Sequence, residues 1–299
     1  MVSILVHAAE QGFAYGVAAL GVFITFRVLR FPDLTVDGSF VTGAAIASSL
    51  LTSTGIDPFL ALAVAFGAGC VAGAVTGLLH TRLGIADLLA GVLSMIMLYS
   101  INLRIMGRPS ISLLRVTTLS DLVERALSPL GVAAILVVLG GLTLAVKFAL
   151  DVFFRTEFGL ALRATGDNEA MIVAQGVNTK TMKVFGLAFS NGLVALSGAL
   201  VAQYSGFADV GMGVGTIVTG LAAVIIGGSL IRSRRIGWMT TSVLVGSLIY
   251  RVAVMFALRY GYLVGFQASD LKLVTSLLVI VALVVPTLRE RLERKVGSC

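Results

Sequence analysis

Few side chains in this sequence are placed to make or break covalent bonds. The histidines, His7 and His80, lie at the ends of different hydrophobic runs, and Cys70 has no histidine beside it. Neither an HExxH nor a GxSxG motif occurs, and Cys70 and Cys299 are too far apart in sequence to indicate a disulfide or a metal site. A phosphate-binding GxxxxGK[ST] loop is also missing. We therefore expect no catalytic residue, metal ion or cofactor in this chain.

Polar side chains that interrupt the hydrophobic runs could instead hydrogen-bond a small solute, because such residues at membrane depth are usually functional. A helix N-terminus could hold the carboxylate of a zwitterion, and an acid could hold its ammonium group. Asp37 has a competing interpretation, as the N-cap of the helix that follows it. The candidate residues are Asp37, Ser39, Asn191, Gln203 and Asp209.

The composition is that of a membrane protein. Hydrophobic residues make up 58% of the chain and charged residues only 12%, with a mean hydropathy of +1.01. A soluble domain of this size carries about 25% charged residues. The hydrophobic runs of roughly 18 to 25 residues are long enough to cross a bilayer as helices. The sequence predicts an all-α, polytopic helical bundle that forms a single transmembrane domain over residues 1–299.

The hydrophobic runs predict about nine membrane spans, within a range of eight to ten. The second span is short and rich in Gly, Ser and Thr, so we expect it to be broken or to cross only part of the membrane. The expected spans are residues 5–29, 38–53, 57–79, 87–106, 131–150, 184–204, 211–231, 236–258 and 270–287.

Basic residues indicate the orientation of these spans, because cytoplasmic loops of membrane proteins collect Lys and Arg. Placing segment 154–183 inside also places inside the RSRR cluster at 232–235 and the RERLERK sequence near the C-terminus. Nine crossings then leave the N-terminus outside and the C-terminus inside. The same rule accounts for the net charge of +7, so no nucleic acid partner is implied.

The longest outer segment covers about residues 107–130. A short amphipathic helix is expected at Leu119–Leu127, with Ser120 as its N-cap and Pro129 after its end. The segment is either a solvated connector or part of a docking surface for an extracytoplasmic partner.

The inner segment, about residues 154–183, is polar and cationic and has the pattern of two short helices. The first is expected at Glu157–Ala164, ended by Gly166. The second is expected to begin with Asp167 as its N-cap and to end with Gly176 in a left-handed conformation. A helix of about nine residues is marginal alone in water. It must pack on its own protein or dock in a groove of a cytosolic protein.

Glycine spacing suggests close packing in two places. Gly69, Gly73 and Gly77 form a GxxxGxxxG ridge, which we expect to pack against another helix of the same chain. The glycine-rich start of the span at 211–231 predicts an irregular backbone, which is tolerated at membrane depth only where it is buried or lines a cavity.

Three segments resemble bacterial ABC importer permeases of the branched-chain amino acid and ribose permease superfamily. They are FRVLRFPDLTVDGSFVTGAA near the N-terminus, GLALRATGDNEAMIVAQGVN followed by SNGLVALSGALVAQ, and ADVGMGVGTIVTGLAAVIIGGSL. The motif DLTVDGS is most similar to that of a sub-branch of tryptophan/tyrosine-type permeases. Together the segments extend over most of the chain.

The resemblance implies a permease subunit in a bacterial inner membrane that imports a small polar solute, such as an amino acid. ATP and Mg²⁺ would bind to separate ABC ATPase subunits. An extracytoplasmic solute-binding protein, a second permease copy in a homodimer and membrane lipid would be the other partners. The coupling residues would be Arg163, Asp167, Asn168, Glu169, Met171, Ile172, Gln175 and Gly176.

An ion-coupled secondary transporter is the alternative interpretation, and a structural or export subunit is a third. Ion coupling would require acids deep within spans. The acids available for this role all fall near expected span ends: Glu10, Asp33, Asp37, Asp57, Asp87, Asp209 and Asp270.

Overall fold

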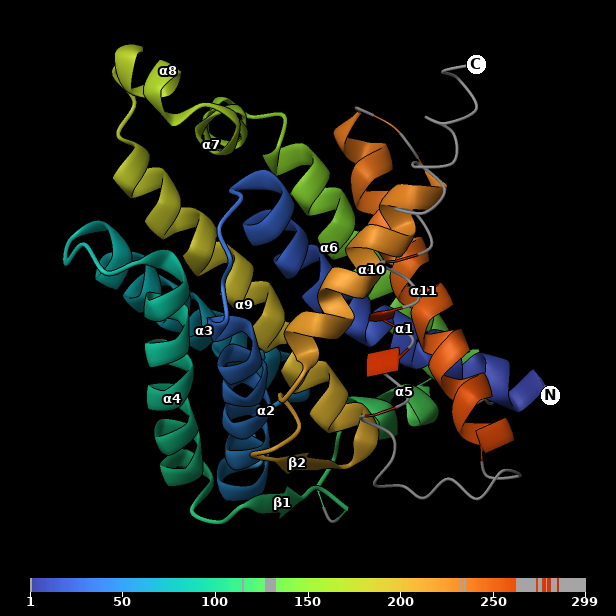
Figure 1. The fold of residues 1–299 in the computed structure, drawn as a ribbon. Coiled ribbons are helices and arrows are strands. Elements are labelled where there is room, and N and C mark those ends of the chain that lie inside the picture. Colours follow the sequence, from blue (N-terminus) through green and yellow to red (C-terminus); the bar gives the residue numbers. More distant parts are fainter. Residues whose placement is uncertain are drawn as a thin grey trace, which may run out of the picture.

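The computed structural model describes residues 2–114, 116–126, 133–231, 233, 235–261 and single residues between 273 and 284. Nearly all described residues are helical (Figure 1). The long helices are α1 (Val2–Val22), α2 (Thr35–Thr54), α3 (Pro58–Thr81), α4 (Asp87–Met106), α6 (Ala133–Phe153), α9 (Thr179–Ser205), α10 (Thr216–Leu230) and α11 (Ile236–Gly261). The short elements are the π-helix η1 (Phe23–Val28), β1 (Ser110–Ser112), α5 (Leu119–Ala126), α7 (Glu157–Asp167), α8 (Glu169–Ala174) and β2 (Phe207–Asp209).

Within the described residues, six helices are long and apolar enough to cross a membrane. They are α1 with η1, α3, α4, α6, α9 and α11, and α10 is a shorter apolar helix. This arrangement confirms a polytopic helical membrane protein. The expected span at 270–287 lies largely outside the described residues.

Of the two alternatives expected for the second span, the break was wrong, whereas a partial crossing of the membrane stays a prediction. Helix α2 runs without interruption over Thr35–Thr54. Its hydroxyl side chains donate to carbonyls of their own helix, for example Thr42 Oγ1 to Gly38 O at 2.9 Å and Ser53 Oγ to Ser49 O at 2.7 Å. These hydroxyl groups are therefore satisfied without breaking the helix, whereas the buried hydroxyls of Ser39 and Ser48 have no partner among the described residues.

Helix α9 lies at the centre of the fold and packs most extensively against α3 and α2 (Figure 1). The ridge of Gly69, Gly73 and Gly77 on α3 faces its backbone, and a Cβ added at Gly73 would collide with the carbonyl of Leu187. The expected packing of this ridge within the chain is confirmed. Small residues let the two backbones approach closely, which is how membrane helices gain van der Waals contact.

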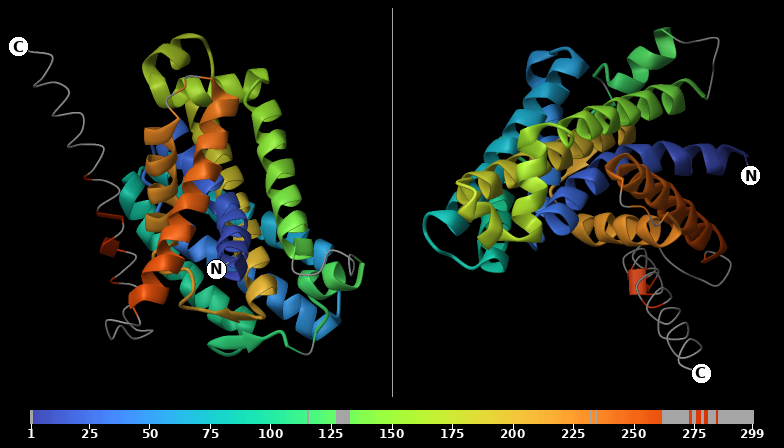
Figure 2. Two further views of the ribbon diagram at one scale, coloured as in Figure 1. Left: turned by 90° about the vertical axis from the view of Figure 1, so that its right-hand side faces the viewer. Right: turned by 90° about the horizontal axis from the view of Figure 1, so that it is seen from above.

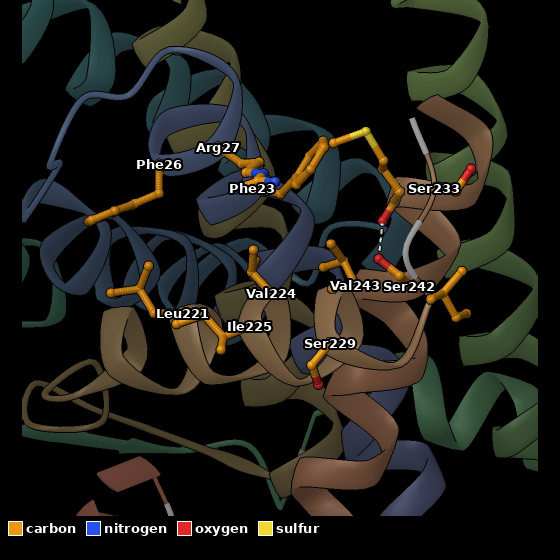
Figure 3. Close-up of a pocket in the computed structure, with 13 residues that line it drawn as sticks. Phe23, Phe26, Arg27, Leu221, Val224, Ile225, Ser229, Ser233, Ser242 and Val243 are labelled. Carbon is orange, nitrogen blue, oxygen red and sulfur yellow. Dashed lines mark hydrogen bonds between the residues drawn. The ribbon is translucent and has the colours of Figure 1, made fainter. Parts of the chain in front are cut away.

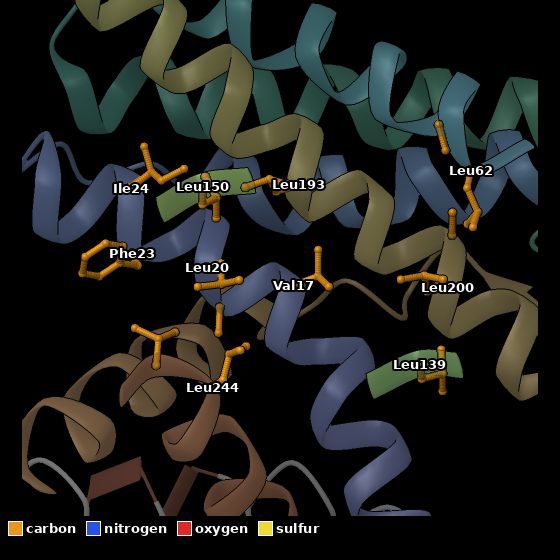
Figure 4. Close-up of a cluster of buried hydrophobic side chains, with 14 of the residues drawn as sticks. Val17, Leu20, Phe23, Ile24, Leu62, Leu139, Leu150, Leu193, Leu200 and Leu244 are labelled. Carbon is orange, nitrogen blue, oxygen red and sulfur yellow. The ribbon is translucent and has the colours of Figure 1, made fainter. Parts of the chain in front are cut away.

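A buried apolar cluster joins α9 to the other long helices on its second side (Figure 4). Leu20 and Phe23 extend from α1 and η1, Leu150 from α6, Leu193 from α9 and Leu244 from α11. All five side chains are at most 5% exposed. The first helix is thus held between α9 and α11, so a displacement of its C-terminal end must displace its neighbours.

Changing Gly43 of α2 to alanine is expected to destabilise the chain by about 1–3 kcal/mol or more. The added methyl group would collide with the backbone carbonyl of Ala195 on α9, and neither helix backbone can yield cheaply. Unfolding in mixed micelles of rising sodium dodecyl sulfate content measures the loss. Gly67→Ala is the control, because its Cβ would meet nothing within 4 Å. Equal stability of the two variants would contradict the close α2–α9 contact.

The fold departs from the all-α prediction in one place. β1 and β2 form a two-stranded antiparallel sheet, with Ser110 opposite Asp209. The sheet lies at the end of the molecule opposite to α7 and α8 (Figure 2, left). The pairing joins segments about a hundred residues apart, so no local pattern could predict it.

The helix expected in the outer segment is confirmed as α5, but its predicted cap was wrong. Thr118 precedes α5, and its N–H and Oγ1 both bond to Asp121 Oδ2, at 2.8 and 2.9 Å. Because Asp121 N also donates to Thr118 Oγ1, the capping is reciprocal, and it starts the helix two residues earlier than a cap at Ser120 would allow. Pro129 lies outside the described residues.

Candidate coupling and translocation sites

The inner segment forms two short helices, as expected, but their boundaries differ from the prediction. Helix α7 continues through Gly166 to Asp167. Asn168, not Asp167, caps α8, because Asn168 Oδ1 accepts a hydrogen bond from Met171 N at 3.0 Å. Helix α8 has six residues, fewer than the nine expected. Gly176 follows it with a φ of +84°, which confirms the expected left-handed position.

Gly166 is explained by the approach of α7 to the first membrane helix. A Cβ at Gly166 would collide with the carbonyl oxygen of Val28, the last residue of η1. Next to this contact, Arg30 donates to Asp167 Oδ1 at 2.9 Å. Arg30 itself has a left-handed φ of 54°, a conformation that non-glycine residues rarely adopt. Gly166 and Asp167 therefore do not separate two helices: they attach α7 to the end of η1.

A second contact attaches α8 to the start of α9. Lys183 Nζ donates to Glu169 Oε2 at 2.8 Å, and this bond holds the pKa of Glu169 below its ordinary value. Ile172 packs inward and is 5% exposed. Met171 and Val173, on the other side of α8, are each 54% exposed. The short helix thus presents an apolar surface that no other described part of the chain covers.

The eight predicted coupling residues lie together on α7, α8 and the turn that follows. Ile172 is buried and Arg163 is partly buried. The other six are exposed at the same end of the molecule: Asp167, Asn168, Glu169, Met171, Gln175 and Gly176.

Protonation of Glu169 is expected to loosen α8. Because its pKa is lowered in the folded chain, Glu169 contributes stability at neutral pH that is lost as the pH falls through that lowered pKa. The pair is partly exposed, so Glu169→Gln should raise hydrogen exchange of residues 168–176 only about two- to fivefold at neutral pH. Peptide-resolved exchange, corrected for intrinsic rates, measures this change. Glu157→Gln is the control, and an equal effect of both variants would contradict the pairing.

The interpretation of Asp37 as the cap of its own helix was wrong. The N-cap position is Leu34, and Asp33 before it supplies the acceptor: its Oδ1 accepts a hydrogen bond from Thr35 N at 2.9 Å. Asp37 instead caps α10: its two carboxylate oxygens accept from Gly215 N at 2.9 Å and from Ile217 N at 2.8 Å. The first N–H groups of a helix lack partners within it, and a carboxylate also matches the positive end of its dipole. Asp37 therefore links α2 to α10.

Asp37 also lines a cavity of about 270 Å³ between α2, α4 and the turn before α10. Met95, Tyr99 and Asn102 of α4 line the same cavity. Asn102 is 1% exposed, and its Oδ1 has no hydrogen-bond partner among the described residues. The glycine-rich stretch before α10 is irregular, as expected, and it forms one side of this cavity through Val214.

The other four candidates occupy separate places. Asn191 Nδ2 donates to Asp33 Oδ2 at 2.6 Å, and both residues are fully buried. Gln203 Oε1 accepts from Leu119 N at 3.0 Å, so it anchors α5. Asp209 lies in β2, where its Oδ1 accepts from Gly211 N. Ser39 is buried on α2, and no described residue bonds its hydroxyl. The structure does not bring the five residues together around one cavity.

A larger cavity, which no sequence pattern predicted, lies at the C-terminal end of the first membrane helix, near α7. Its volume is about 730 Å³, and it lies between η1, α10 and α11 (Figure 3). Phe23, Phe26 and Arg27 line it from η1, and Val224 and Val243 line it from α10 and α11. The sequence signal that could have indicated this cavity is the pair of arginines in FRVLR, which are three residues apart and precede the second span.

A neighbouring cavity of about 440 Å³ joins this space to the inner segment. Phe26, Arg27 and Met239 line both cavities. Arg163 and Asp167 of α7 line the second one only. The contact between α7 and η1 therefore lies beside two adjacent cavities at this end of the molecule.

Comparison with known proteins finds relatives that are similar along nearly the whole chain. The family described as branched-chain amino acid transport system / permease component matches residues 4–285. A tyrosine transport system permease protein of Clostridioides difficile is 41% identical over 97% of this chain and 94% of its own length. An uncharacterized protein of Rickettsia prowazekii is 33% identical over 94% of this chain and 97% of its own length.

A third relative is an inner membrane ABC transporter permease protein of Escherichia coli. It is 28% identical over 72% of this chain and 64% of its own length. No solved structure gives a significant match. The resemblance seen in the sequence is confirmed, and the several apolar helices fit a multi-pass protein of the bacterial inner membrane. The chain belongs to the family of branched-chain amino acid transport system permease components.

Proposed function

We propose that this chain is the membrane subunit of an ABC importer for a small polar solute, with an aromatic amino acid such as tyrosine as the first candidate. The relative most informative about the solute is the tyrosine transport permease, which is similar along nearly its whole length. ATP and Mg²⁺ bind to separate ATPase subunits, and a binding protein delivers the solute from outside. The single observation that carries this assignment is the exposed apolar surface of α8, on an arm fixed to the first membrane helix.

The orientation in this proposal places α7 and α8 in the cytoplasm. Arg30, Arg155 and Arg163 lie with these helices, and cytoplasmic segments of membrane proteins are rich in basic residues. The N-terminus and the β1–β2 sheet then face outward, where α5 and the sheet could meet the binding protein. Nine crossings, counting 270–287, place the C-terminus inside.

Beyond the surface that docks in the ATPase, the coupling path runs through contacts within this chain. Met171 and Val173 of α8 dock in the ATPase, and Ile172 and the Glu169–Lys183 pair carry the motion of α8 to α9. Helix α7 transmits the same motion to η1 through the Gly166–Val28 contact. Since η1 lines the cavity of about 730 Å³, its displacement changes the inner end of the solute path. Such transmission is a rigid-body movement between two packed states.

We assign the outer part of the path to Asp37. Ser39, Asn191, Gln203 and Asp209, which lie at separate places, are kept as candidates for further contacts along the path. Asp37 joins α2 to the N-terminus of α10 and lines a cavity. A movement of α2 relative to α10 would therefore change the shape of this cavity. Two copies of the chain, related as a homodimer, would enclose the complete path.

Uptake by reconstituted vesicles tests the proposal against ion coupling. The chain, its ATPase and its binding protein are placed in liposomes, and uptake of labelled tyrosine, leucine and ribose is measured. ATP-dependent uptake that disappears when the ATPase cannot hydrolyse ATP is expected. Uptake by the chain alone, driven by a proton gradient, would instead support a secondary transporter.

A further inference from the structure

A cavity of about 580 Å³ between α6 and α11 is not used by the proposed transport mechanism. It lies at the end of the molecule where α7 begins, and charged residues line much of it. Lys147, Asp151 and Arg155 come from α6 and the turn after it, while Arg235 and Trp238 come from the start of α11. Three cations and one acid therefore surround a single space.

The acid in this cavity is already fully engaged. Asp151 Oδ2 pairs with Lys147 Nζ at 2.7 Å, and its Oδ1 accepts a hydrogen bond from Thr240 Oγ1 at 2.6 Å. Both members of this ion pair are almost buried. Arg155 and Arg235 are exposed, and neither forms an ion pair with any residue that the structure describes. The cavity thus carries two cations that are not neutralised, which suits an anionic group.

The apolar surroundings indicate where that anionic group comes from. Val137, Leu144, Phe148 and Val152 are 44–64% exposed and share one outward face of α6, a helix long enough to span the membrane. Phe148 and Val152 also line the cavity, so it opens onto an exposed apolar surface that suits lipid chains. Trp238 is 53% exposed at the same level, and tryptophan favours the membrane–water interface.

We propose that this cavity binds the headgroup of an anionic phospholipid from the inner leaflet. Arg155 and Arg235 hold the phosphate, Trp238 lies at the glycerol level, and an acyl chain lies along Phe148 and Val152. Basic pockets between membrane helices on the cytoplasmic side suit this chemistry. The assignment of the leaflet rests on the proposed orientation. Because Arg155 precedes Thr156, the N-cap of α7, bound lipid would fix the root of the coupling arm.

The chain offers its own reporter for this site, since Trp238 is its only tryptophan. The full-length chain is purified in micelles of neutral lipid and detergent, and Trp238 fluorescence is followed while brominated lipid, which quenches tryptophan, is added. Brominated phosphatidylglycerol is compared with brominated phosphatidylcholine. We expect the anionic lipid to quench at about tenfold lower concentration, because two arginines near a headgroup favour it.

The double variant Arg155→Gln/Arg235→Gln should quench equally with both lipids. Arg82→Gln, a basic residue after α3, is the matched control and should keep the preference. Circular dichroism verifies that the variants fold. Equal quenching of the unaltered chain, or a preference that survives in the double variant, would overturn the proposal. Loss of the preference in excess inorganic phosphate would assign the cavity to a free anion instead. No ATPase is needed, so failure here leaves the proposed transport function standing.

Discussion

Replacing Gly166 with alanine is expected to reduce ATP-driven uptake about tenfold or more while the chain still folds and inserts. The added methyl group would collide with the Val28 carbonyl and push α7 away from η1. A movement of α7 and α8 would then be transmitted less effectively to the first membrane helix. Uptake in reconstituted vesicles is the measurement, together with ATP hydrolysis, which should continue without matched transport.

Gly141→Ala is the matched control for this experiment. A Cβ at Gly141 of α6 would meet nothing within 4 Å, so uptake should be unchanged. Thermal melts of both variants in detergent separate loss of coupling from loss of folding. Normal uptake by Gly166→Ala would show that the α7–η1 contact does not transmit the motion.

Replacing Asp37 with alanine is expected to lower both the stability of the chain and its uptake of solute. Two N–H groups at the start of α10 would lose their acceptor, at a cost of about 2 kcal/mol in stability. Asp37→Asn should cost less, because one amide oxygen can still accept. Unfolding by sodium dodecyl sulfate measures the stability of each variant, and vesicle uptake measures its function.

Asp57→Ala is the matched control, because Asp57 also caps a helix through its carboxylate. Its Oδ1 accepts from Phe59 N at 2.8 Å, but the residue is exposed at the start of α3. Its loss should cost about 1 kcal/mol and leave uptake unchanged. If uptake by Asp37→Ala matched that of Asp57→Ala, Asp37 would have no part in the solute path.

Features set by local sequence were predictable. The apolar runs predicted the long helices because a helix must satisfy its own backbone within lipid. The spacing of Gly69, Gly73 and Gly77 predicted a packed ridge, since residues four apart lie on one helix face. Gly176 was expected in a left-handed conformation because a glycine directly after a helix is the usual left-handed C-cap.

Features set by distant contacts were not predictable. Gly166 was interpreted as a helix end, because nothing in the local pattern reveals the Val28 carbonyl against which it packs. Asp37 was assigned to its own helix, although its partners Gly215 and Ile217 are about 180 residues away. In both cases the residue type was recognised as special, and only the fold could supply the partner.

The central claim is that α8 is the arm that a cytoplasmic ATPase moves. The most direct test places a cysteine at Met171, in a chain whose Cys70 and Cys299 are changed to serine, and exposes it to a membrane-impermeant maleimide. Labelling in inside-out vesicles, blocked once the ATPase is bound, is the result that we predict. Labelling of intact cells from the outside, or labelling that the bound ATPase leaves unchanged, would contradict the claim.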